Sequence, residues 1–154
     1  MNGQSTMSIW KKCQLFLKLH SLGTKWCGAG NIAENFDDLG PERETDKCCR
    51  DHDFCPDLIE AGETKYNLTN EAFYSRLSCE CDQRFQECLR ATKKRTAHNI
   101  GTVYFNALGT KCFREDYPIV ACVRRGGWLN SKCLEYIYST SESKRYQWFD
   151  VIDY

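Results

Sequence analysis

Cysteine is the residue type that most constrains the fold of this chain. Its 154 residues, the length of one ordinary domain, contain eleven cysteines. They occur as one Cys-Cys doublet, one Cys-x-Cys and scattered single residues, a spacing unlike the paired ligands of zinc ribbons and fingers. We therefore expect disulfides formed in an oxidising compartment, and hence a secreted, extracellular protein. The odd count leaves one cysteine over.

The stretch 48–57 combines three of these cysteines with one of only three histidines. As a helix, it places Cys48, His52 and Cys55 at positions i, i+4 and i+7, on one face. Pro56 is expected to end this helix, because the residue before a proline is pushed out of helical geometry. A titratable ring would thus lie between two potential covalent anchors.

A second helix is predicted over about 70–90, where apolar residues recur at helical spacing. It carries Cys81 and Cys88, which are seven residues apart, like the two cysteines of the first helix. Two antiparallel helices could therefore be linked twice, through Cys48–Cys88 and Cys55–Cys81. The spacing permits this connectivity and does not prove it.

The segments around these helices are expected to be short. Residues 31–44 read as a loop that ends at Thr45, the expected N-cap of the first helix. Residues 91–99 are basic and polar and read as a solvated connector. A short third helix is expected around 103–108 and would be closed by Gly109.

The part of the chain from about residue 117 is typical of β structure. Two runs rich in β-branched and aromatic residues, 119–123 and 133–138, flank a glycine-containing loop and predict a hairpin that Cys122 and Cys133 could close. The expected fold class is therefore mainly α and disulfide-rich. It has two antiparallel disulfide-linked helices, a short third helix and a small C-terminal β-hairpin wing.

The first 21 residues differ from the remainder. Two lysines precede a short apolar run, but Lys18 interrupts it, and the run lacks the ~7–15 apolar residues of a signal peptide. We interpret residues 1–21 as a leader or propeptide remnant or an incomplete start, in preference to a real amphipathic extension. The domain is then 22–154. Cys13 lies in the extension and is the natural odd cysteine.

The charge balance limits the classes of partner. The net charge of zero gives no indication of nucleic-acid binding. Residues 1–21 contain three lysines and no acidic residue, which leaves 18 basic and 21 acidic residues in 22–154. Such a domain is not built for strong electrostatic attraction to anionic membranes. No stretch approaches the ~20 apolar residues that a transmembrane helix needs.

Two shorter patterns concern ligands and modification. The loop 26–31, Trp-Cys-Gly-Ala-Gly-Asn, contains Gly28 and Gly30, which tolerate positive φ and let neighbouring carbonyl groups present oxygens to a hard cation. On its own, this pattern favours a plain surface turn. Asn67 begins an Asn-x-Thr sequon and is a candidate glycan acceptor.

The glycine loop followed by Cys-Cys-x-x-His-Asp resembles the secreted phospholipase A2 family, and more closely its bee-venom type, called group III. The resemblance runs from about Gly23 to Tyr154 and leaves residues 1–21 outside. It rests on six stretches that occur in this order: 26–31, 46–57, 77–82, 104–106, 110–112 and 146–150.

The resemblance implies an N-terminal calcium-binding loop. The ligands of Ca²⁺ would be the backbone carbonyls of Trp26, Gly28 and Gly30 and the carboxylate of Asp53. Waters or lipid oxygens would complete the six to eight oxygens that calcium takes. Ala29 is tolerable where the bee-venom type often has histidine, because that position would contribute backbone only.

The resemblance also implies a histidine–aspartate dyad. His52 would be the general base for a water that attacks the sn-2 ester carbonyl, since histidine exchanges a proton readily near neutral pH. Asp82 would accept the other ring N–H, and Tyr104 would hydrogen-bond Asp82. Calcium and the N–H of Gly28 would stabilise the oxyanion.

The implied function is calcium-dependent hydrolysis of glycerophospholipids, which releases a free fatty acid and a lysophospholipid. The enzyme would act as a monomer at a phospholipid membrane surface, for which Leu58 and Ile59 are suggested contacts. The alternative is a non-catalytic secreted lipid- or receptor-binding protein on the same fold. The intact His52, Asp53 and Asp82 argue against that alternative.

The resemblance implies a complete disulfide pairing as well: Cys27–Cys49, Cys48–Cys88, Cys55–Cys81, Cys79–Cys112 and Cys122–Cys133. This pairing leaves Cys13 over. The other two histidines, His20 and His98, have no comparable neighbours and are expected to have no role.

Overall fold

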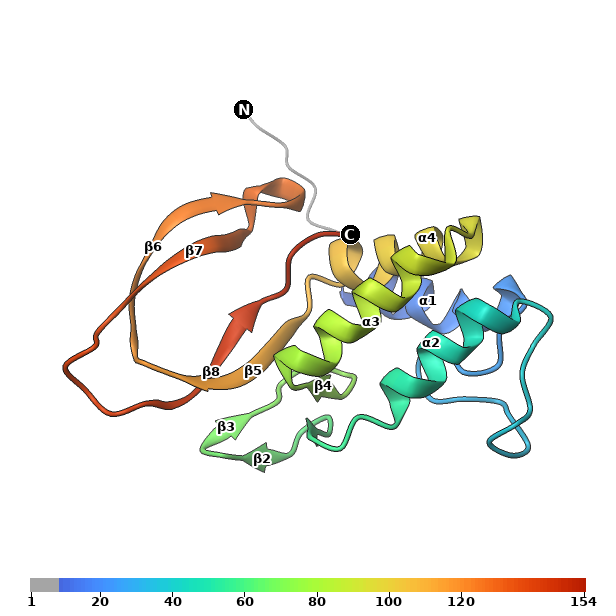
Figure 1. Cartoon of the computed structure of the whole chain (residues 1–154), viewed down its shortest axis with the longest axis horizontal. Coiled ribbons are helices and arrows are strands. Elements are labelled where there is room, and N and C mark those ends of the chain that lie inside the picture. Colours follow the sequence, from blue (N-terminus) through green and yellow to red (C-terminus); the bar gives the residue numbers. More distant parts are fainter. Residues whose placement is uncertain (1–8) are drawn as a thin grey trace.

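The computed structural model describes residues 9–154, without the side chains of Ile9, Trp10, Cys13 and Leu17, so the prediction for Cys13 lies outside it. The chain forms helices and two-stranded antiparallel sheets (Figure 1). The helices are α1 (Ile9–Leu17), α2 (Arg43–Asp53), α3 (Cys79–Thr92) and α4 (Arg95–Gly101), with the shorter η1 (Lys18–Leu22), η2 (Thr102–Ala107) and η3 (Trp128–Asn130). The strands are β1 (Leu58–Ile59), β2 (Thr64–Lys65), β3 (Leu68–Thr69), β4 (Arg76–Leu77), β5 (Lys111–Asp116), β6 (Ile119–Gly126), β7 (Lys132–Tyr138) and β8 (Arg145–Asp150).

Helices α2 and α3 lie antiparallel (Figure 1). The disulfide Cys48–Cys88 joins them, and Cys55–Cys81 joins α3 to the residue two positions after the end of α2. Phe85 of α3 is buried in the same core as Cys48. The other three implied disulfides, Cys27–Cys49, Cys79–Cys112 and Cys122–Cys133, also form. The disulfide framework expected from the sequence is therefore present.

The predicted start of the first helix is wrong. Helix α2 begins at Arg43, with Glu42 at the N-cap position, so Thr45 lies inside the first turn. Thr45 is fully buried there and cannot serve as a cap at the helix end. Helix α2 stops at Asp53, before Pro56 as expected, but Cys55 lies beyond its end, so only Cys48 and His52 of the predicted face are helical.

The predicted start of the second helix is also wrong. Helix α3 begins at Cys79, because the Ser78 hydroxyl accepts the N–H of Cys81 at 3.3 Å and caps the helix. The preceding residues fold around the buried side chain of Asn70, which donates to the carbonyl of Tyr74 at 2.8 Å. The segment from about residue 70 to Ser78, which was predicted to be helical, is therefore held in a non-helical turn by the buried Asn70 amide.

The third helical segment begins earlier than predicted. Arg95, in the stretch expected to be a connector, starts α4, and η2 continues it. Ala97, Ile100, Tyr104 and Phe105 are all buried, at spacings that keep them on one face. The apolar face of this helical segment begins in a stretch of mostly basic and polar residues, and that composition led to the prediction of a connector.

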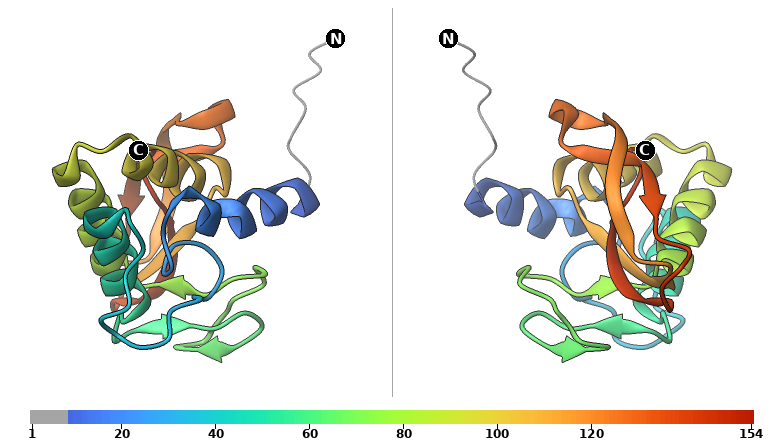
Figure 2. Two further views of the ribbon diagram at one scale, coloured as in Figure 1. Left: turned by 90° about the vertical axis from the view of Figure 1, so that its right-hand side faces the viewer. Right: turned by 90° about the vertical axis from the view of Figure 1, so that its left-hand side faces the viewer.

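The N-terminal segment packs against the domain. Phe16 and Leu19 are 7% and 3% exposed and belong to the same core as Phe85 and Tyr104. Helix α1 lies on the opposite side of the molecule from the turn between α3 and α4 (Figure 2). Within the described residues, we find no helix with the length and apolar character needed to cross a membrane.

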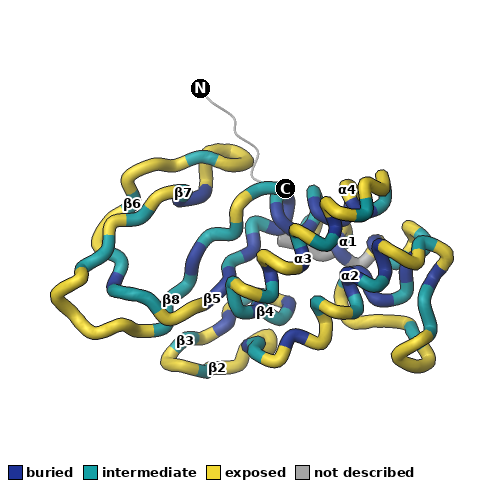
Figure 3. Tube along the Cα trace, in the orientation of Figure 1, coloured by how far each residue is buried: buried dark blue, intermediate teal, exposed yellow. Residues whose placement is uncertain are grey.

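The predicted hairpin wing is confirmed, because β6 pairs with β7. A second pairing was not predicted: β5 and β8 align over six residues each, from Lys111 opposite Asp150 to Asp116 opposite Arg145. Phe113 of β5 is fully buried, whereas most of β6 is exposed (Figure 3). The β5–β8 pair thus anchors the wing to the helices.

The loop after α2 carries small strand pairs. Tyr66 and Asn67 form the two-residue turn between β2 and β3, with φ of 54° and 61°, as a type I′ turn requires. Asn67 is exposed, so the sequon lies on an accessible turn. Ile59 of β1 is fully buried, which excludes it as a membrane-contacting side chain, whereas Leu58 lines the pocket described below.

Candidate active site

His52, in the last turn of α2, and Asp82, in the first turn of α3, form a hydrogen-bonded pair. His52 Nε2 lies 2.8 Å from Asp82 Oδ1, and the Tyr104 hydroxyl donates to the same oxygen at 2.9 Å. Because an ionised carboxylate only accepts hydrogen bonds, Nε2 carries the proton and Nδ1 is the acceptor nitrogen of the ring. The fold thus brings three of the predicted residues together.

Packing holds this pair in place. Asp82 is 1% exposed and the side chain of His52 is 10% exposed. The His52 ring stacks on Phe85 with a centroid distance of 4.1 Å and meets the edge of Tyr104 at 5.1 Å. Burial and the adjacent Asp82 carboxylate raise the pKa of Tyr104 well above its ordinary value. The Tyr104 hydroxyl therefore keeps its proton and its hydrogen bond at neutral pH.

The glycine loop lies against α2, and the Cys27–Cys49 disulfide joins the two. Gly28 and Gly30 have φ of 109° and 68°, which favour glycine. A Cβ at Gly28 would also lie 3.0 Å from the carbonyl oxygen of Phe16, so a side chain there would displace the N-terminal segment. Among the described residues, no hydrogen bond ends on the carbonyl oxygens of Gly28 or Gly30.

Asp46 holds this loop from inside the protein. Its fully buried carboxylate accepts N–H groups from Lys25, Trp26 and Gly40 at 2.9, 2.8 and 2.8 Å. Asp46 lies in the first turn of α2. Nothing in the local sequence indicates that two amides from the distant residues 25–26 and one from Gly40 converge on it.

Asp53 follows His52 and lines the same pocket as the glycine loop. It keeps an exposed surface, yet the surrounding protein removes enough water to raise the pKa of its carboxyl to about 7, and the nearby charge of Asp46 adds to this shift. No described residue forms an ion pair or a hydrogen bond with the Asp53 carboxylate. An ionised carboxylate in this position would be stabilised by a cation.

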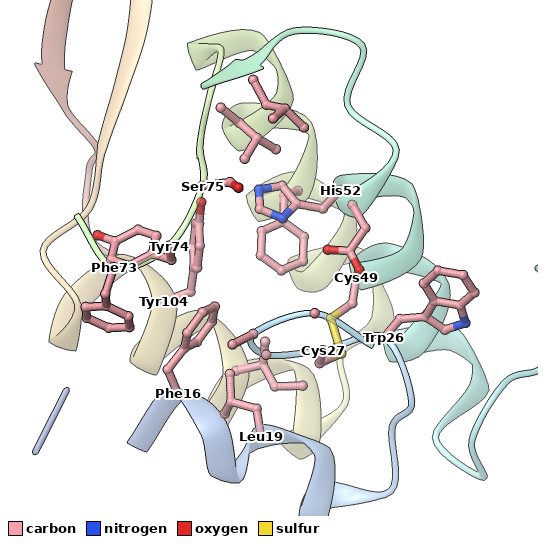
Figure 4. Close-up of a pocket in the computed structure, with 18 of the residues that line it drawn as sticks. Phe16, Leu19, Trp26, Cys27, Cys49, His52, Phe73, Tyr74, Ser75 and Tyr104 are labelled. Atoms are coloured by element: carbon pink, nitrogen blue, oxygen red, sulfur yellow. A yellow bond between two sulfur atoms is a disulfide. The ribbon is translucent and has the colours of Figure 1, made fainter. Parts of the chain in front are cut away.

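These groups open onto one pocket of about 350 Å³ (Figure 4). His52, Asp53, Tyr104 and the loop residues Trp26, Gly28 and Gly30 line it together. The rest of the wall is largely apolar and includes Phe16, Leu19, Phe73, Tyr74, Leu77 and Ile100. Such a pocket suits a ligand with a long apolar part and a polar group near the histidine.

The pocket also contains residues that the sequence did not assign to it. Phe16 comes from the segment interpreted as a remnant, and its ring lies 5.8 Å from that of Tyr74 and 6.4 Å from that of Tyr104. Phe85 of α3 also lines the pocket. His98 lies away from the pocket, beside Tyr154.

A metal ion in this pocket would depend on backbone oxygens. Within the described part of the chain, no group of three or more His, Cys, Asp or Glu side chains is placed to hold a metal. The pocket offers one unpaired carboxylate, Asp53, and loop carbonyls without hydrogen bonds.

Comparisons with known proteins agree with this architecture. Residues 20–116 match the family model described as Phospholipase A2. "Phospholipase A2" of Xylocopa aruana is 52% identical over 130 residues, which cover 84% of this chain and 70% of the relative. "Phospholipase A2" of Bombus terrestris is 52% identical over 134 residues, or 86% of this chain and 97% of the relative. "Phospholipase A2 large subunit" of Chersonesometrus fulvipes is 48% identical over 100 residues, or 62% of this chain and 96% of the relative. The chain belongs to the phospholipase A2 family.

Proposed function

We propose that this chain hydrolyses the sn-2 ester of glycerophospholipids in a calcium-dependent reaction. The observation that carries the proposal is the 2.8 Å contact between the buried Asp82 Oδ1 and His52 Nε2, because His52 lines one pocket together with Asp53 and the glycine loop. A free fatty acid and a lysophospholipid are the products.

His52 acts as the general base. Its Nδ1 takes a proton from a water molecule, whose oxygen attacks the ester carbonyl. Asp82 holds the ring in the required tautomer and stabilises the imidazolium that forms, and Tyr104 restrains Asp82. The proton is then returned to the leaving lysophospholipid oxygen, so no serine or cysteine nucleophile is needed.

The residues of the pocket fit a calcium ion. Asp53 would supply the carboxylate oxygen, and Trp26, Gly28 and Gly30 would supply backbone carbonyls, the oxygen donors that calcium prefers. The raised pKa of Asp53 supports this assignment, because it indicates a carboxylate without a compensating charge. When bound, the ion would stabilise negative charge on the ester carbonyl oxygen. The N–H of Gly28 would donate to the same oxygen.

The setting of the reaction is part of the proposal. Five disulfides support secretion into an oxidising extracellular space. The enzyme would act as a monomer that binds a phospholipid surface peripherally. Residues 22–154 would form the catalytic domain, with residues 1–21 as an extension whose last part packs on it.

The test uses vesicles of phosphatidylcholine with different acyl chains at sn-1 and sn-2, with calcium or with excess chelator. We expect release of the sn-2 fatty acid in calcium, loss of release in chelator and recovery when calcium is added back. Release of the sn-1 chain, or release that the chelator leaves unchanged, would contradict the proposal. No release under any condition would favour the non-catalytic lipid- or receptor-binding alternative.

A further inference from the structure

Four cationic side chains, Arg90, Lys93, Lys94 and Arg95, lie within six residues where α3 ends and α4 begins. We call them the α3–α4 basic cluster. All four are exposed, and they line one shallow hollow together with His98 and Tyr154. The whole chain has 21 basic and 21 acidic residues, so 17 basic residues remain elsewhere and the rest of the chain is net negative.

The cluster lacks an acidic partner in the part of the chain that the structure describes. Among the described residues, none of its four side chains forms an ion pair, and the guanidinium of Arg90 instead lies 5.3 Å from the ring centre of Tyr154. Elsewhere several cations do have acidic partners: Lys25 lies 2.7 Å from Asp38, and Lys65 lies 2.8 Å from Asp57. The positive charge of the cluster is therefore available to an external anion.

Helix stability accounts for only part of this arrangement. Arg90 and Lys93 lie at the C-terminal end of α3, where the helix dipole favours positive charge. Lys94 and Arg95 lie at the start of α4, where the dipole favours negative charge, yet the first turn of α4 has no acidic residue. Lys93 also adopts φ of 53°, a left-handed conformation that non-glycine residues rarely adopt. The turn holds like charges together at an electrostatic cost that a bound polyanion would offset.

The position of the cluster separates it from the lipid site. The α3–α4 turn lies on one side of the molecule, and α1, which contributes Phe16 to the pocket wall, lies on the other (Figure 2). A membrane that feeds the pocket from the α1 side would leave the cluster facing water. This step rests on the proposed function, whereas anion binding by the cluster does not.

We propose that the α3–α4 basic cluster binds a soluble sulfated polysaccharide. Arginine and lysine groups spaced along one hollow can each contact a sulfate of an extended polymer, and each contact releases counterions. A chain with five disulfides belongs to an oxidising compartment, where sulfated polysaccharides rather than nucleic acids are the extended polyanions. Binding there would hold the enzyme in an extracellular matrix with its pocket unobstructed.

The test measures binding of the full chain to size-defined heparin at several salt concentrations. The test variant carries Arg90→Gln, Lys93→Gln, Lys94→Gln and Arg95→Gln. A matched control carries Arg124→Gln, Arg125→Gln, Lys144→Gln and Arg145→Gln, four exposed positions on or beside the wing with the same loss of charge. We expect at least tenfold weaker binding by the test variant and a salt dependence reduced by about three to four counterions. The control should change binding less than threefold.

Absence of heparin binding by the unmodified chain, or equal losses of heparin binding in the test and control variants, would overturn the proposal. It would also be overturned if the test variant kept its heparin binding and lost binding to phosphatidylserine vesicles. A DNA duplex of similar length that competes as well as heparin would overturn the choice of polysaccharide. Vesicle hydrolysis by both variants is measured in parallel and should match the unmodified chain. If none of the three proteins hydrolyses vesicles, the proposed function is contradicted. The heparin measurement still decides the binding proposal, because it does not depend on hydrolysis.

Discussion

The α2–α3 pair and the β6–β7 hairpin are both closed by disulfides, but their surroundings differ. His52 lies between Cys48 on α2 and Cys55 just beyond its end, so the two disulfides to α3 flank the contact between His52 and Asp82. Phe85, 5% exposed, fills the space beside them. A small displacement of either helix would therefore change the distance between His52 and Asp82 directly.

The hairpin has much less support from the core. No residue of β6 is buried, and Val120, Val123 and Ile137 are 64%, 57% and 49% exposed. The register between β6 and β7 shifts three times along the pair. The helix pair adds buried contacts around its disulfides, whereas in the wing only the start of β7, Lys132 and Cys133, is buried. The comparison teaches that covalent closure alone does not fix a side chain as firmly as closure with a surrounding core.

The largest expected effect tests the chemical side of this comparison. His52→Gln removes the proposed proton acceptor, and we expect vesicle hydrolysis to fall by about 10²–10⁴-fold. The glutamine amide can still donate to Asp82, so the fold should persist. Val123→Ala, on the exposed face of the wing, is the control and should leave the hydrolysis rate unchanged. Hydrolysis by His52→Gln within tenfold of the unmodified chain would refute the assigned base.

Removal of disulfides tests the structural side. Cys48→Ala with Cys88→Ala opens a link between residues 40 apart, and Cys122→Ala with Cys133→Ala opens one between residues 11 apart. Loop entropy predicts losses of about 4 and about 3 kcal/mol in the free energy of unfolding, measured in urea. These losses are similar, so activity is the discriminating measurement. Hydrolysis per folded molecule should drop for the first variant and persist for the second, and equal drops would break the comparison.

The same contrast explains what could be predicted from the sequence. The double link between two antiparallel segments could be proposed from cysteine positions alone, because a seven-residue spacing is about two helical turns. The cysteines are Cys48, Cys55, Cys81 and Cys88. The hairpin could be predicted because β-branched runs around glycines are a local signal. Each of these inferences needs information from only one or two segments.

The remainder depends on contacts that no local pattern encodes. The start of α3 at Cys79 depends on the Ser78 cap and on the buried turn around Asn70. The role of Asp46 depends on the amides of Lys25 and Trp26, about twenty residues away, and on that of Gly40. Phe16 was set aside with residues 1–21, although its ring packs beside Tyr104 in the pocket. The roles of His52 and Asp82 could be predicted from the family resemblance, but the distance between their side chains could be obtained only from the folded structure.

A smaller effect is expected for the hydroxyl that supports the dyad. Tyr104→Phe removes one donor from the buried Asp82, and a hydrogen bond to a charged group contributes about 1.5–3 kcal/mol to the free energy of unfolding. Hydrolysis should fall less than tenfold, because His52 keeps its own contact with Asp82. The matched control is Tyr138→Phe, whose exposed hydroxyl accepts from Arg114 at 3.1 Å, and it should change stability by less than about 0.5 kcal/mol. Equal losses in the two variants would mean that burial of the dyad has no energetic consequence.

The smallest effect concerns Asp53 and its pH dependence. Its carboxyl pKa is raised from 3.8 to about 7, so between these pH values the folded state binds more protons than the unfolded state. Stability without metal should therefore fall as pH rises from about 4 to about 7 and then level off. Because Asp53 keeps an exposed surface, solvent screening limits the effect, and we expect a shift in Tm of about 2–4 °C in chelator.

Asp53→Asn separates this carboxylate from the other titrating groups. In chelator at pH 8, Asp53→Asn should melt above the unmodified chain, because it lacks the uncompensated charge. Added calcium should raise the Tm of the unmodified chain and leave that of Asp53→Asn unchanged. The control, Asp51→Asn, removes an exposed charge two residues away and should retain both the pH dependence and the calcium response. An Asp53→Asn variant that calcium stabilises as strongly as the unmodified chain would show that the ion binds elsewhere, and the rigid end of α2 would then hold the base without the metal ligand.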